Sequence, residues 1–442
     1  MPAPDPVAAD PELPARAAIV VIGGGIIGAA TALELAERGH EVALCEKGEI
    51  AAEQSSRNWG WCRQMSRDPR EIPLIVESLR LWRTMNERVE AETGFRECGI
   101  LYLAQSASEL DAKLKWYEEN AKPFGLSSRP VSGAEAAALQ PGAAVSWTGG
   151  LYTPDDGRAE PVKAAPAMAQ AARRRGAKIF TRCAVRGIET AAGRVSGVVT
   201  ERGAIGCSTV VLAGGVWSRL FLGNLGIPFP QAAVVNSVMR TAPLDAGVER
   251  SCSAGKFSFR RRLDGGYTIA HRHLSVADIV PESVTQFFRF LPALRLDRQG
   301  LRLRLGKAFL ASLRRKRRWR LDEPTPFEDV RILDPEPVED ILDEALQSLK
   351  SCFPAFGEAK IAERWVGCID ATPDAVPVIS AVDKLPGLYL ASGFSGHGFG
   401  IGPGAAKLMA DLVTGKPPVV DPQPFRHSRY FDGSNPRPIT GL

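Results

Sequence analysis

The stretch VIGGGIIG, residues 21–28, decides the fold. It closes an unbroken apolar run, AAIVVI (17–22), which is typical of a buried parallel strand. Apolar residues at helical spacing follow it as far as Gly39, a typical helix stop. A second strand-like segment, EVALCEK (41–47), comes next. The order of strand, glycine turn, helix and strand predicts the first βαβ unit of a dinucleotide-binding fold.

The glycines and the acidic residue of this unit each have a mechanical purpose. Gly23, Gly25 and Gly28 form G-x-G-x-x-G, which allows a tight turn and lets a pyrophosphate approach the N-terminus of the helix. Glu46 lies eighteen residues after Gly28, where a carboxylate would accept hydrogen bonds from ribose hydroxyls. An acid at this place disfavours NADP, whose 2′-phosphate needs a cation. The alternative, a glycine-rich turn that binds nothing, is disfavoured by the complete strand and helix context.

A second glycine run near the end of the chain selects the cofactor. GFSGHGFGIGPG (393–404) has glycine at six of its twelve positions and precedes an amphipathic stretch, AAKLMADLVTG (405–415). Without side chains in the way, a flat ring can come close to the backbone N–H groups at a helix N-terminus. The positive end of the helix dipole then stabilises negative charge that develops on the ring. A flavin needs such a contact far from its adenine end, whereas a nicotinamide enzyme needs no second glycine-rich helix start. The two runs together predict FAD.

Bulk composition excludes several other classes of protein. The 442 residues suffice for two to three domains, and a net charge of +5 is too small for a nucleic-acid partner to be expected. The eight cysteines include no C-x-x-C pair, so we expect reduced thiols in a cytosolic protein and no metal site. Residues 1–16 are rich in Pro and Ala and predict a disordered leader. We expect no transmembrane helix, because the apolar stretch 17–33 divides into strand and helix.

Several motifs in order resemble the D-amino acid oxidase superfamily of FAD-dependent oxidoreductases, and the likeness is greatest to the bacterial membrane-associated L-amino acid deaminases. It spans about residues 17–425. The motifs that carry it are VIGGGIIG, EQSSRNWG (53–60), CAVRGIET (183–190), VVLAGGVWSRLF (210–221), RWVGCIDATPDAVPVI (364–379) and GFSGHGFGIGPG. We expect the chain to differ from the deaminases in having no N-terminal membrane or twin-arginine segment, and its 393–404 loop is similar to that of the oxidase and dehydrogenase relatives.

The resemblance implies a mixed α/β fold in which a Rossmann-like FAD-binding domain is interleaved with a substrate domain built on an antiparallel sheet. The FAD-binding domain is expected from 17–100, 150–225 and 360–420. The substrate domain is expected from 101–149 and 226–359, with a basic insertion at 275–330. Residues 421–442 would form a C-terminal tail.

The glycine motifs and the resemblance together give the residues expected to bind FAD. They comprise the first turn, the ribose carboxylate, the 54–60 loop, the adenine contact, the strand end over the cofactor and the ring loop. The expected residues are Gly23, Gly25, Ile26, Ile27, Gly28, Glu46, Lys47, Gln54, Ser55, Ser56, Arg57, Asn58, Trp59, Gly60, Val185, Ala213, Gly214, Trp217, Gly393, Phe394, Gly396, His397, Gly398, Phe399 and Gly400. Cys368 lies near the place where some relatives attach flavin covalently, but its spacing to Thr372 differs from theirs, so we expect non-covalent FAD.

Three residues are expected to serve catalysis. The segment KFSFRRRLDGGYTIAHRH (256–273) predicts a β-hairpin with an Asp-Gly turn, and strand alternation places Ser258, Arg260 and Arg262 on one face. The resemblance implies that Arg260 binds the substrate carboxylate; the alternative is that Arg260, Arg261 and Arg262 are all solvated. His397, inside the glycine run, would contact the flavin or gate the site. Gln64, with Trp59 to Arg63, would line the substrate pocket or pack as part of a large loop.

The predicted reaction transfers a hydride from the α-carbon of an L-amino acid to flavin N5, which leaves an imine that hydrolyses to a 2-oxo acid and ammonia. No side-chain base is required, because the flavin carries the chemistry. Two alternatives stay open. The first is an oxidase or dehydrogenase of D-amino acids or of N-alkylated amino acids such as sarcosine. The second is a flavin-binding or redox-sensing module without turnover.

The segment LRLRLGKAFLASLRRKRRWR (301–320) contains nine Lys or Arg and no acid. It predicts either a solvated helix face or a surface that rests on an anionic membrane, with the protein peripheral on the inner face. Membrane contact would favour quinone as the electron acceptor, and a free protein would favour oxygen. No nucleic-acid-binding fold accompanies the basic segment.

Overall fold

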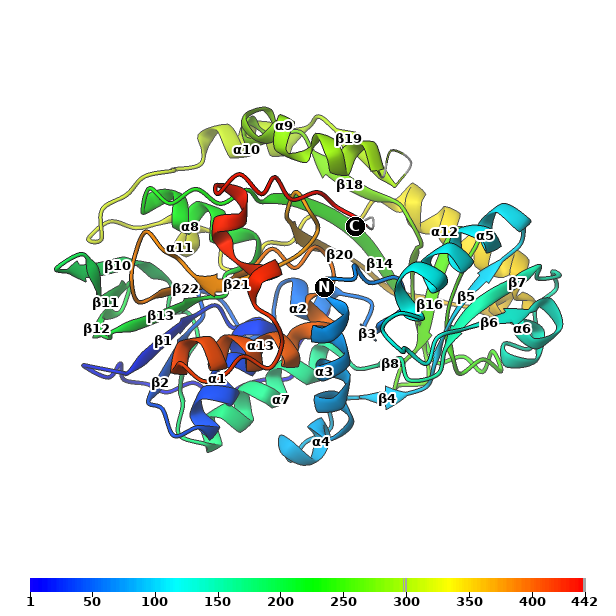
Figure 1. Cartoon of the computed structure of the whole chain (residues 1–442), viewed down its shortest axis with the longest axis horizontal. Coiled ribbons are helices and arrows are strands. Elements are labelled where there is room, and N and C mark those ends of the chain that lie inside the picture. Colours follow the sequence, from blue (N-terminus) through cyan, green and yellow to red (C-terminus); the bar gives the residue numbers. More distant parts are fainter. Residues whose placement is uncertain (297, 299, 440–442) are drawn as a thin grey trace.

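The computed structural model describes residues 1–296, 298 and 300–439, and its two main layers are a mostly parallel sheet and a larger, mostly antiparallel one (Figure 1). The first sheet has six strands, parallel except at the β21–β22 edge. Their order is β21 (Val378–Ala381), β22 (Leu388–Ser392), β13 (Thr209–Leu212), β1 (Ile19–Ile22), β2 (Val42–Cys45) and β9 (Lys178–Phe180).

The central strand β1 is buried on both faces, which explains its unbroken apolar sequence. Ile19 and Val21 face a helical layer, whereas Val20 and Ile22 face the opposite core. The helical layer consists of α1 (Ile26–Glu37), α13 (Gly398–Thr414), α7 (Pro161–Arg174) and α3 (Ile72–Arg83). The opposite face is covered by α8 (Ser218–Asn224) and a small antiparallel sheet, β10 (Val185–Ala191), β11 (Arg194–Thr200) and β12 (Gly203–Gly206).

The larger sheet extends away from the first one on the side that carries α5, α6 and α12 in Figure 1. Its order is β19 (Leu301–Arg304), β18 (Ser275–Asp278), β14 (Ala232–Thr241), β17 (Tyr267–His271), β16 (Phe257–Arg261), β15 (Ser251–Ala254), β5 (Ile100–Ala104), β7 (Gly149–Thr153) and β6 (Arg129–Ser132), with β20 (Ile361–Ala371) paired to β14. Helix α12 (Glu339–Cys352) packs Leu342 and Leu349 into a core with Phe259 and Phe353.

The remaining elements are short or peripheral. A three-stranded sheet joins β3 (Trp61–Cys62), β8 (Gly157–Arg158) and β4 (Arg96–Glu97). The other α-helices are α2 (Gln54–Arg57), α4 (Met85–Arg88), α5 (Ala107–Trp116), α6 (Gly133–Leu139), α9 (Pro281–Leu296), α10 (Lys307–Arg314) and α11 (Pro326–Asp329).

The predicted fold class is confirmed, as are the βαβ unit and the hairpin of β16 and β17. The predicted domain limits differ from the strand pairing in two places. Strand β20 lies within the expected FAD-binding segment 360–420, yet it pairs with β14 along ten positions from Ala232 to Thr241. Strand β7, at the start of the expected segment 150–225, pairs with β5 and β6. Both strands therefore belong to the larger sheet and carry the chain between the two layers.

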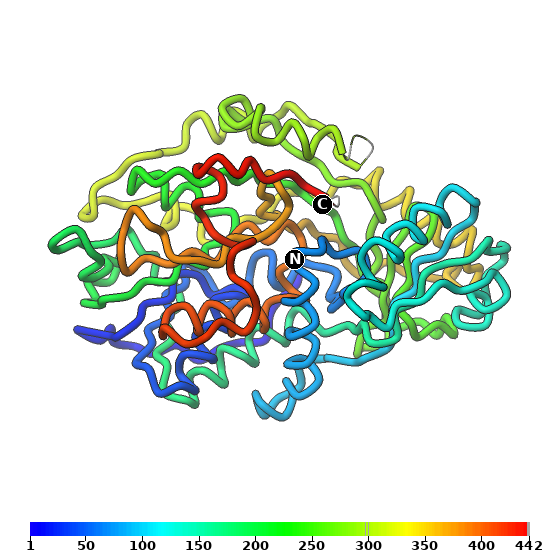
Figure 2. Tube along the Cα trace, in the orientation of Figure 1, coloured from blue at the N-terminus to red at the C-terminus, as the bar shows by residue number. Residues whose placement is uncertain are grey.

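The prediction of a disordered leader at 1–16 is wrong. Its backbone follows α7, where the Asp5 N–H donates to the Val162 carbonyl at 2.9 Å. Asp10 accepts from the Ile179 N–H at 2.9 Å and pairs with Arg173. The C-terminal tail is also packed: Figure 2 shows it in red against the orange segment that contains β21, where Arg429 binds Asp374. Many polar contacts compensate here for a composition that is poor in large apolar residues.

The basic insertion forms a layer of its own, α9, β19 and α10, at the edge of the molecule opposite α1 and α7 (Figure 1). The segment 301–320 is thus a strand followed by a helix, with β19 paired in parallel to β18. Among the helices of the described chain, none combines the length and the apolar character needed to span a bilayer.

Candidate functional site

The first cavity lies at the turn between β1 and α1, where the two sheets and α13 converge. Gly25 is the N-cap of α1 and has no side chain with which to cap it. Ser55 Oγ, from α2, accepts from the Ile26 N–H at 2.8 Å. The positive end of the α1 dipole therefore lies at the cavity wall, where it favours an anionic group.

Two glycines of the first motif are required by close backbone packing. A Cβ on Gly23 would collide with the Ala213 carbonyl oxygen of β13's C-terminal end, and Gly23 has a φ of +106°. A Cβ on Gly28 would collide with the Gly23 carbonyl oxygen. Gly28 therefore does not line the cavity but lets α1 pack on the turn, while Gly23 brings the turn against residue 213.

Glu46 lies at the end of β2 and holds the backbone around the cavity. Its two carboxylate oxygens accept from the N–H groups of Gly24 and Gly48, both at 2.7 Å. Burial raises the pKa of Glu46, although Lys47 and these hydrogen bonds oppose the rise. Each oxygen keeps a second lone pair for a further donor, which is what a ribose diol would offer.

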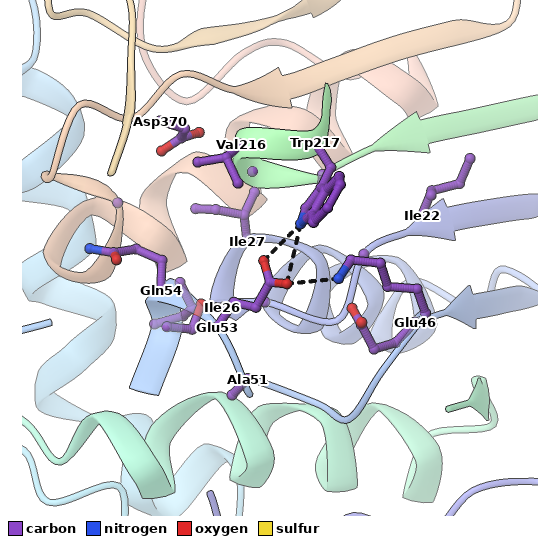
Figure 3. Close-up of a pocket in the computed structure, with 18 of the residues that line it drawn as sticks. Ile22, Ile26, Ile27, Glu46, Ala51, Glu53, Gln54, Val216, Trp217 and Asp370 are labelled. Atoms are coloured by element: carbon purple, nitrogen blue, oxygen red, sulfur yellow. Dashed lines mark hydrogen bonds and ion pairs between the residues drawn. The ribbon is translucent and has the colours of Figure 1, made fainter. Parts of the chain in front are cut away.

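A polar cluster that the sequence did not predict crosses the middle of the cavity (Figure 3). Glu53 is its centre: it accepts from Lys47 Nζ at 2.7 Å and from Trp217 Nε1 at 3.0 Å. Lys47 Nζ also lies 4.5 Å from the centroid of the Trp217 ring. The cluster fixes the Trp217 ring in the cavity wall, because Lys47 lies over the ring and Glu53 accepts a hydrogen bond from its Nε1.

The loop that follows Glu53 turns some of its predicted residues toward the cavity and others away. Gln54, Ser55 and Asn58 line it. Asn58 Nδ2 donates to the Ser55 carbonyl at 2.8 Å, and Asn58 Oδ1 accepts from the Gly60 N–H at 2.7 Å, so this side chain also shapes the turn. Arg57 is buried and binds Asp334 and the carbonyls of Leu333 and Val366. It joins α2 to the larger sheet and does not reach the cavity.

Asp370, at the end of β20, holds the second glycine run against the cavity. Its carboxylate accepts from the Gly393 N–H at 2.6 Å, and Gly393 has a φ of +81°. Burial raises the pKa of Asp370 to about 6, while backbone hydrogen bonds from Gly393 and Phe394 oppose the rise. The N-terminus of α13 follows directly, with Gly396 and Gly398 in the cavity wall.

His397 does not face the cavity, contrary to the expectation that it contacts the flavin. Its ring Nδ1 lies 2.8 Å from Glu71 Oε2, and both side chains are buried. Burial lowers the pKa of His397, and the nearby Arg67 lowers it further, against the opposing charge of Glu71. The histidine is therefore neutral near pH 7 and anchors the N-terminus of α13 to the segment before α3.

Arg260 is also placed differently from the prediction. Strand alternation does turn it inward, but its guanidinium meets Glu160, with Nη1–Oε1 at 2.9 Å and Nη2–Oε2 at 3.0 Å. Its Nε donates to the Trp59 carbonyl, and the side chain is 1% exposed. Neither cavity includes Arg260 in its wall. The forked pair already satisfies the guanidinium, so the structure gives Arg260 a structural role and not the binding of a substrate carboxylate.

Gln64 is buried in the turn after β3 and lies outside both cavity walls. Its N–H donates to Asp156 Oδ1 at 2.7 Å, and the neighbouring Met65 N–H donates to the other carboxylate oxygen. Burial raises the pKa of Asp156 to about 7, against those two hydrogen bonds. The structure therefore supports the alternative in which this loop is packed and does not line the substrate pocket.

The expected cofactor residues divide into two groups. Those that line the first cavity are Gly23, Gly25, Ile26, Ile27, Glu46, Lys47, Gln54, Ser55, Asn58, Val185, Ala213, Gly214, Trp217, Phe394, Gly396, Gly398 and Phe399. Those outside its wall are Gly28, Ser56, Arg57, Trp59, Gly60, Gly393, His397 and Gly400. Within the second group, Gly400 packs against the Trp61 carbonyl and Cys62.

Sequence reasoning missed part of the wall. The missed residues include Glu53, Phe327, Arg331 and Asp370, while Cys368, which was expected near the flavin, is also in the wall. Glu53 and Asp370 are acids inside two of the family motifs, whereas Phe327 of α11 and Arg331 just after it come from a distant segment that no local pattern connects to the site. Burial raises the pKa of the Cys368 thiol to about 12, so it is protonated near neutral pH and is a poor nucleophile for covalent attachment.

A second cavity, of about 1130 Å³, adjoins the first and shares Val216, Trp217 and Cys368 with it. It lies between β14 and the insertion layer. Its wall is mainly apolar but contains several arginines: Arg219, Arg289, Arg315, Arg317 and Arg318. In the described parts of the chain no cluster of His, Cys, Asp and Glu has the grouping of a metal site.

The first cavity fits FAD. Its glycine cradle and the N-terminus of α1 suit a diphosphate, and Glu46 has acceptor capacity for a ribose. Gln54 Oε1 is buried without a hydrogen-bond partner among the described residues, which a bound polar group would correct. The N-terminus of α13 supplies a second positive helix end at the other side of the cavity.

Comparison with known proteins agrees with this fit. The family model for FAD dependent oxidoreductases matches residues 18–412. A solved structure of L-amino acid deaminase from Proteus myxofaciens, in complex with anthranilate, is 37% identical and superposes with a TM-score of 0.93, covering 97% of this chain and 96% of that one.

Two curated relatives are more distant. Glycine oxidase of Pseudomonas aeruginosa is 24% identical over 92% of this chain and 97% of its own length. The 4-methylaminobutanoate oxidase (formaldehyde-forming) of Paenarthrobacter nicotinovorans is 25% identical over 96% of this chain, which spans only 47% of that relative.

We expect Gly23→Ala to weaken cofactor binding by about tenfold or more, equivalent to about 1.4 kcal/mol. The added methyl meets the carbonyl oxygen of residue 213, and the positive φ strains any other residue. Titration of apoprotein with FAD, followed by flavin fluorescence, measures the affinity. Gly223→Ala is the control, because nothing lies within 4 Å of its added methyl. Equal affinity in the two variants would contradict the assigned role of Gly23.

We expect Glu160→Gln to lower the free energy of unfolding by about 3 to 5 kcal/mol near pH 7, because Arg260 is left buried without a counter-charge. Burial tends to raise the pKa of Glu160, but Arg260 outweighs it and lowers this pKa to about 2. The depressed pKa contributes stability above the unfolded value near 4.5 and loses it as pH falls toward 2. Urea unfolding should therefore show the difference between wild type and variant narrowing from pH 5 to pH 3.5. A constant difference would mean that the pKa of Glu160 is the same in the native and unfolded states, so that Arg260 does not lower it.

Proposed function

The chain belongs to the family of FAD-dependent oxidoreductases, and from this premise we propose that it oxidises L-α-amino acids at the Cα–N bond. The observation that supports this most is the near-complete superposition on an L-amino acid deaminase, at 37% identity. FAD, when bound, supplies the hydride acceptor. The resulting imine hydrolyses to a 2-oxo acid and ammonia.

We propose that the substrate lies in the second cavity, where it adjoins the cofactor cavity. Arg260 is unavailable, so another cation must bind the carboxylate. Among the described residues, the guanidinium groups of Arg219 and Arg315 have no hydrogen bond or ion pair, and Arg315 lies 5.4 Å from the centroid of the Trp217 ring. Trp217 belongs to both cavity walls, so these arginines can hold a carboxylate beside the cofactor.

The side chains of the protein position the substrate and exclude water, and none of them removes a proton from the substrate. Of the described residues that line the two cavities, none is a histidine. Hydride removal from a neutral amine needs alignment more than a base. The ligand of the Proteus structure, anthranilate, carries a carboxylate and an amine, the same pair of groups that an α-amino acid presents.

We also propose that the insertion layer rests on an anionic membrane at its inner face, so that quinone or oxygen reoxidises the cofactor. Apolar side chains protrude from this layer although water surrounds them, and Phe288 is 84% exposed. The other exposed apolar residues of the layer are Val284, Phe287, Leu296, Leu303, Leu305, Leu310 and Leu313. The basic residues of 301–320 lie among them, which is the composition of a membrane-surface segment.

Anaerobic visible spectroscopy tests the proposed reaction. L-amino acids should bleach the flavin band of the purified holoprotein, and D-enantiomers and sarcosine should leave it unchanged. Bleaching by D- or N-alkyl compounds alone would replace the proposal with the alternative oxidase or dehydrogenase. A flavin that no amino acid reduces would instead favour a binding or sensing module.

The same spectra test the carboxylate site. In Arg219→Met and Arg315→Met the substrate concentration for half-maximal reduction should rise, for at least one of them by about tenfold or more, as expected for the loss of a charge-assisted pair. The limiting rate should change less, because the carboxylate contact is present before and during the reaction. Arg182→Met, at a side chain that is 79% exposed, is the control. Unchanged half-saturation in both cavity variants would exclude these arginines as the anchor.

Vesicle sedimentation tests the membrane proposal. The wild-type protein should sediment with phosphatidylglycerol vesicles, less with phosphatidylcholine vesicles, and less again at high salt, because salt screens the basic residues. Phe288→Asp should reduce binding about fivefold or more, since a charge replaces a group that enters the interface. Phe124→Asp, also at an exposed Phe, should not. Absence of sedimentation at low salt would refute membrane contact.

A further inference from the structure

The second cavity is much larger than an amino acid requires. At about 1130 Å³ it exceeds the range of about 300 to 1000 Å³ that is usual for sites of drug-sized ligands. An amino acid beside Trp217 would occupy one end of it and leave most of its apolar wall uncovered. The part of the cavity that the amino acid leaves empty therefore suits a ligand that is larger and more apolar than the substrate.

The apolar wall forms a path from the cofactor cavity to the surface. At the inner end are Val216, Trp217 and Cys368, which both cavities share. At the outer end are Phe287 and Phe288 of α9, which line the cavity and are also exposed. The path therefore opens on the face of the insertion layer that carries the protruding apolar side chains.

Besides the two free arginines, a further polar group in this wall lacks a hydrogen-bond partner. Gln286 of α9 lines the cavity, and its Oε1 is buried without a hydrogen bond among the described residues. Such a group is costly to bury unless a ligand or water completes it. A primary amide can donate to a carbonyl or accept from a hydroxyl, so it suits both forms of a quinone and quinol pair.

Resting on the proposed function, we propose that this channel binds a lipid-soluble quinone, which enters from the membrane at α9 and places its ring toward Trp217 and Cys368. Substrate and quinone would use the cavity in turn, because reduction and reoxidation of the cofactor are separate half-reactions. The quinone gains two electrons and two protons and leaves as the quinol, while the cofactor returns to its oxidised form. The isoprenoid tail would cover the apolar wall between Phe290 and Phe287.

Photolabelling with an azido-quinone that carries a decyl tail tests the site directly. Detergent-solubilised holoprotein should be labelled in the wall of the second cavity, within 281–294 or at Trp217 or Cys368, and excess unlabelled decyl-quinone should prevent the labelling. Ala293→Trp adds bulk inside the cavity and should reduce labelling about fivefold or more. Gln286→Leu removes the amide with little change in size and should reduce it as well. Leu296→Trp, on the same helix but outside the cavity wall, should not.

Three outcomes would overturn the proposal. They are labelling outside the cavity wall, labelling that excess quinone does not prevent, and labelling that is equal in wild type, Ala293→Trp and Gln286→Leu. Anaerobic reduction by L-amino acids, measured in the same preparations, separates this proposal from the proposed function. A flavin that is bleached without specific labelling contradicts the quinone channel alone, whereas specific labelling of a protein that no amino acid reduces contradicts the proposed reaction alone.

Discussion

The site depends on one close packing of backbone against backbone, that of Gly23 on the chain at the end of β13. No side chain fits between Gly23 and the Ala213 carbonyl, so the turn after β1 lies directly on the neighbouring strand end. Because the turn is held there, α1 begins at the cavity, where its N-cap residue Gly25 has no side chain and Ser55 Oγ accepts from the Ile26 N–H. A larger residue at position 23 would move the turn, the N-terminus of α1 and the Glu46 contacts together. Binding of a diphosphate therefore depends on the absence of a Cβ at Gly23 as much as on any charge.

Buried polar pairs near the site serve mainly to hold separate segments of the chain together. Arg260 is paired to Glu160, Arg57 to Asp334, and His397 to Glu71, and each pair joins segments far apart in the sequence. A charged side chain that is buried on folding needs a counter-charge in the protein. A substrate carboxylate cannot fill this role, because it is absent when the protein folds. Arg260 and His397, which were expected to be catalytic, therefore have structural roles. Of the arginines in the wall of the second cavity, Arg219 and Arg315 have no side-chain hydrogen bond or ion pair among the described residues.

The sequence predicts well those parts of the structure that local rules determine. The β1–α1–β2 unit, the Asp-Gly hairpin and the start of α13 each follow from a few adjacent residues, and all are present. The exchange of strands between sheets was not predictable, because the pairing of β20 with β14 joins residues more than 100 positions apart. The same limit applies to the site: Glu53 belonged to a recognised motif, but its contact with Trp217 needed the folded chain. Strand alternation correctly predicted that Arg260 points inward, but it could not predict that Arg260 would form an ion pair with Glu160.

The insertion layer forms one wall of the second cavity, although few of its side chains are buried. No residue of α9 is fully buried, although the helix is sixteen residues long and contains Pro292. Elements with few buried apolar contacts open at a smaller cost in free energy than the core does. A wall of this kind admits a bulky ligand by moving, while the rigid wall on β14 and β20 keeps the reacting end fixed. Weak packing of α9 is therefore a requirement of the site that it covers, because a well-packed helix would seal a cavity that must exchange a substrate, a product and an electron acceptor.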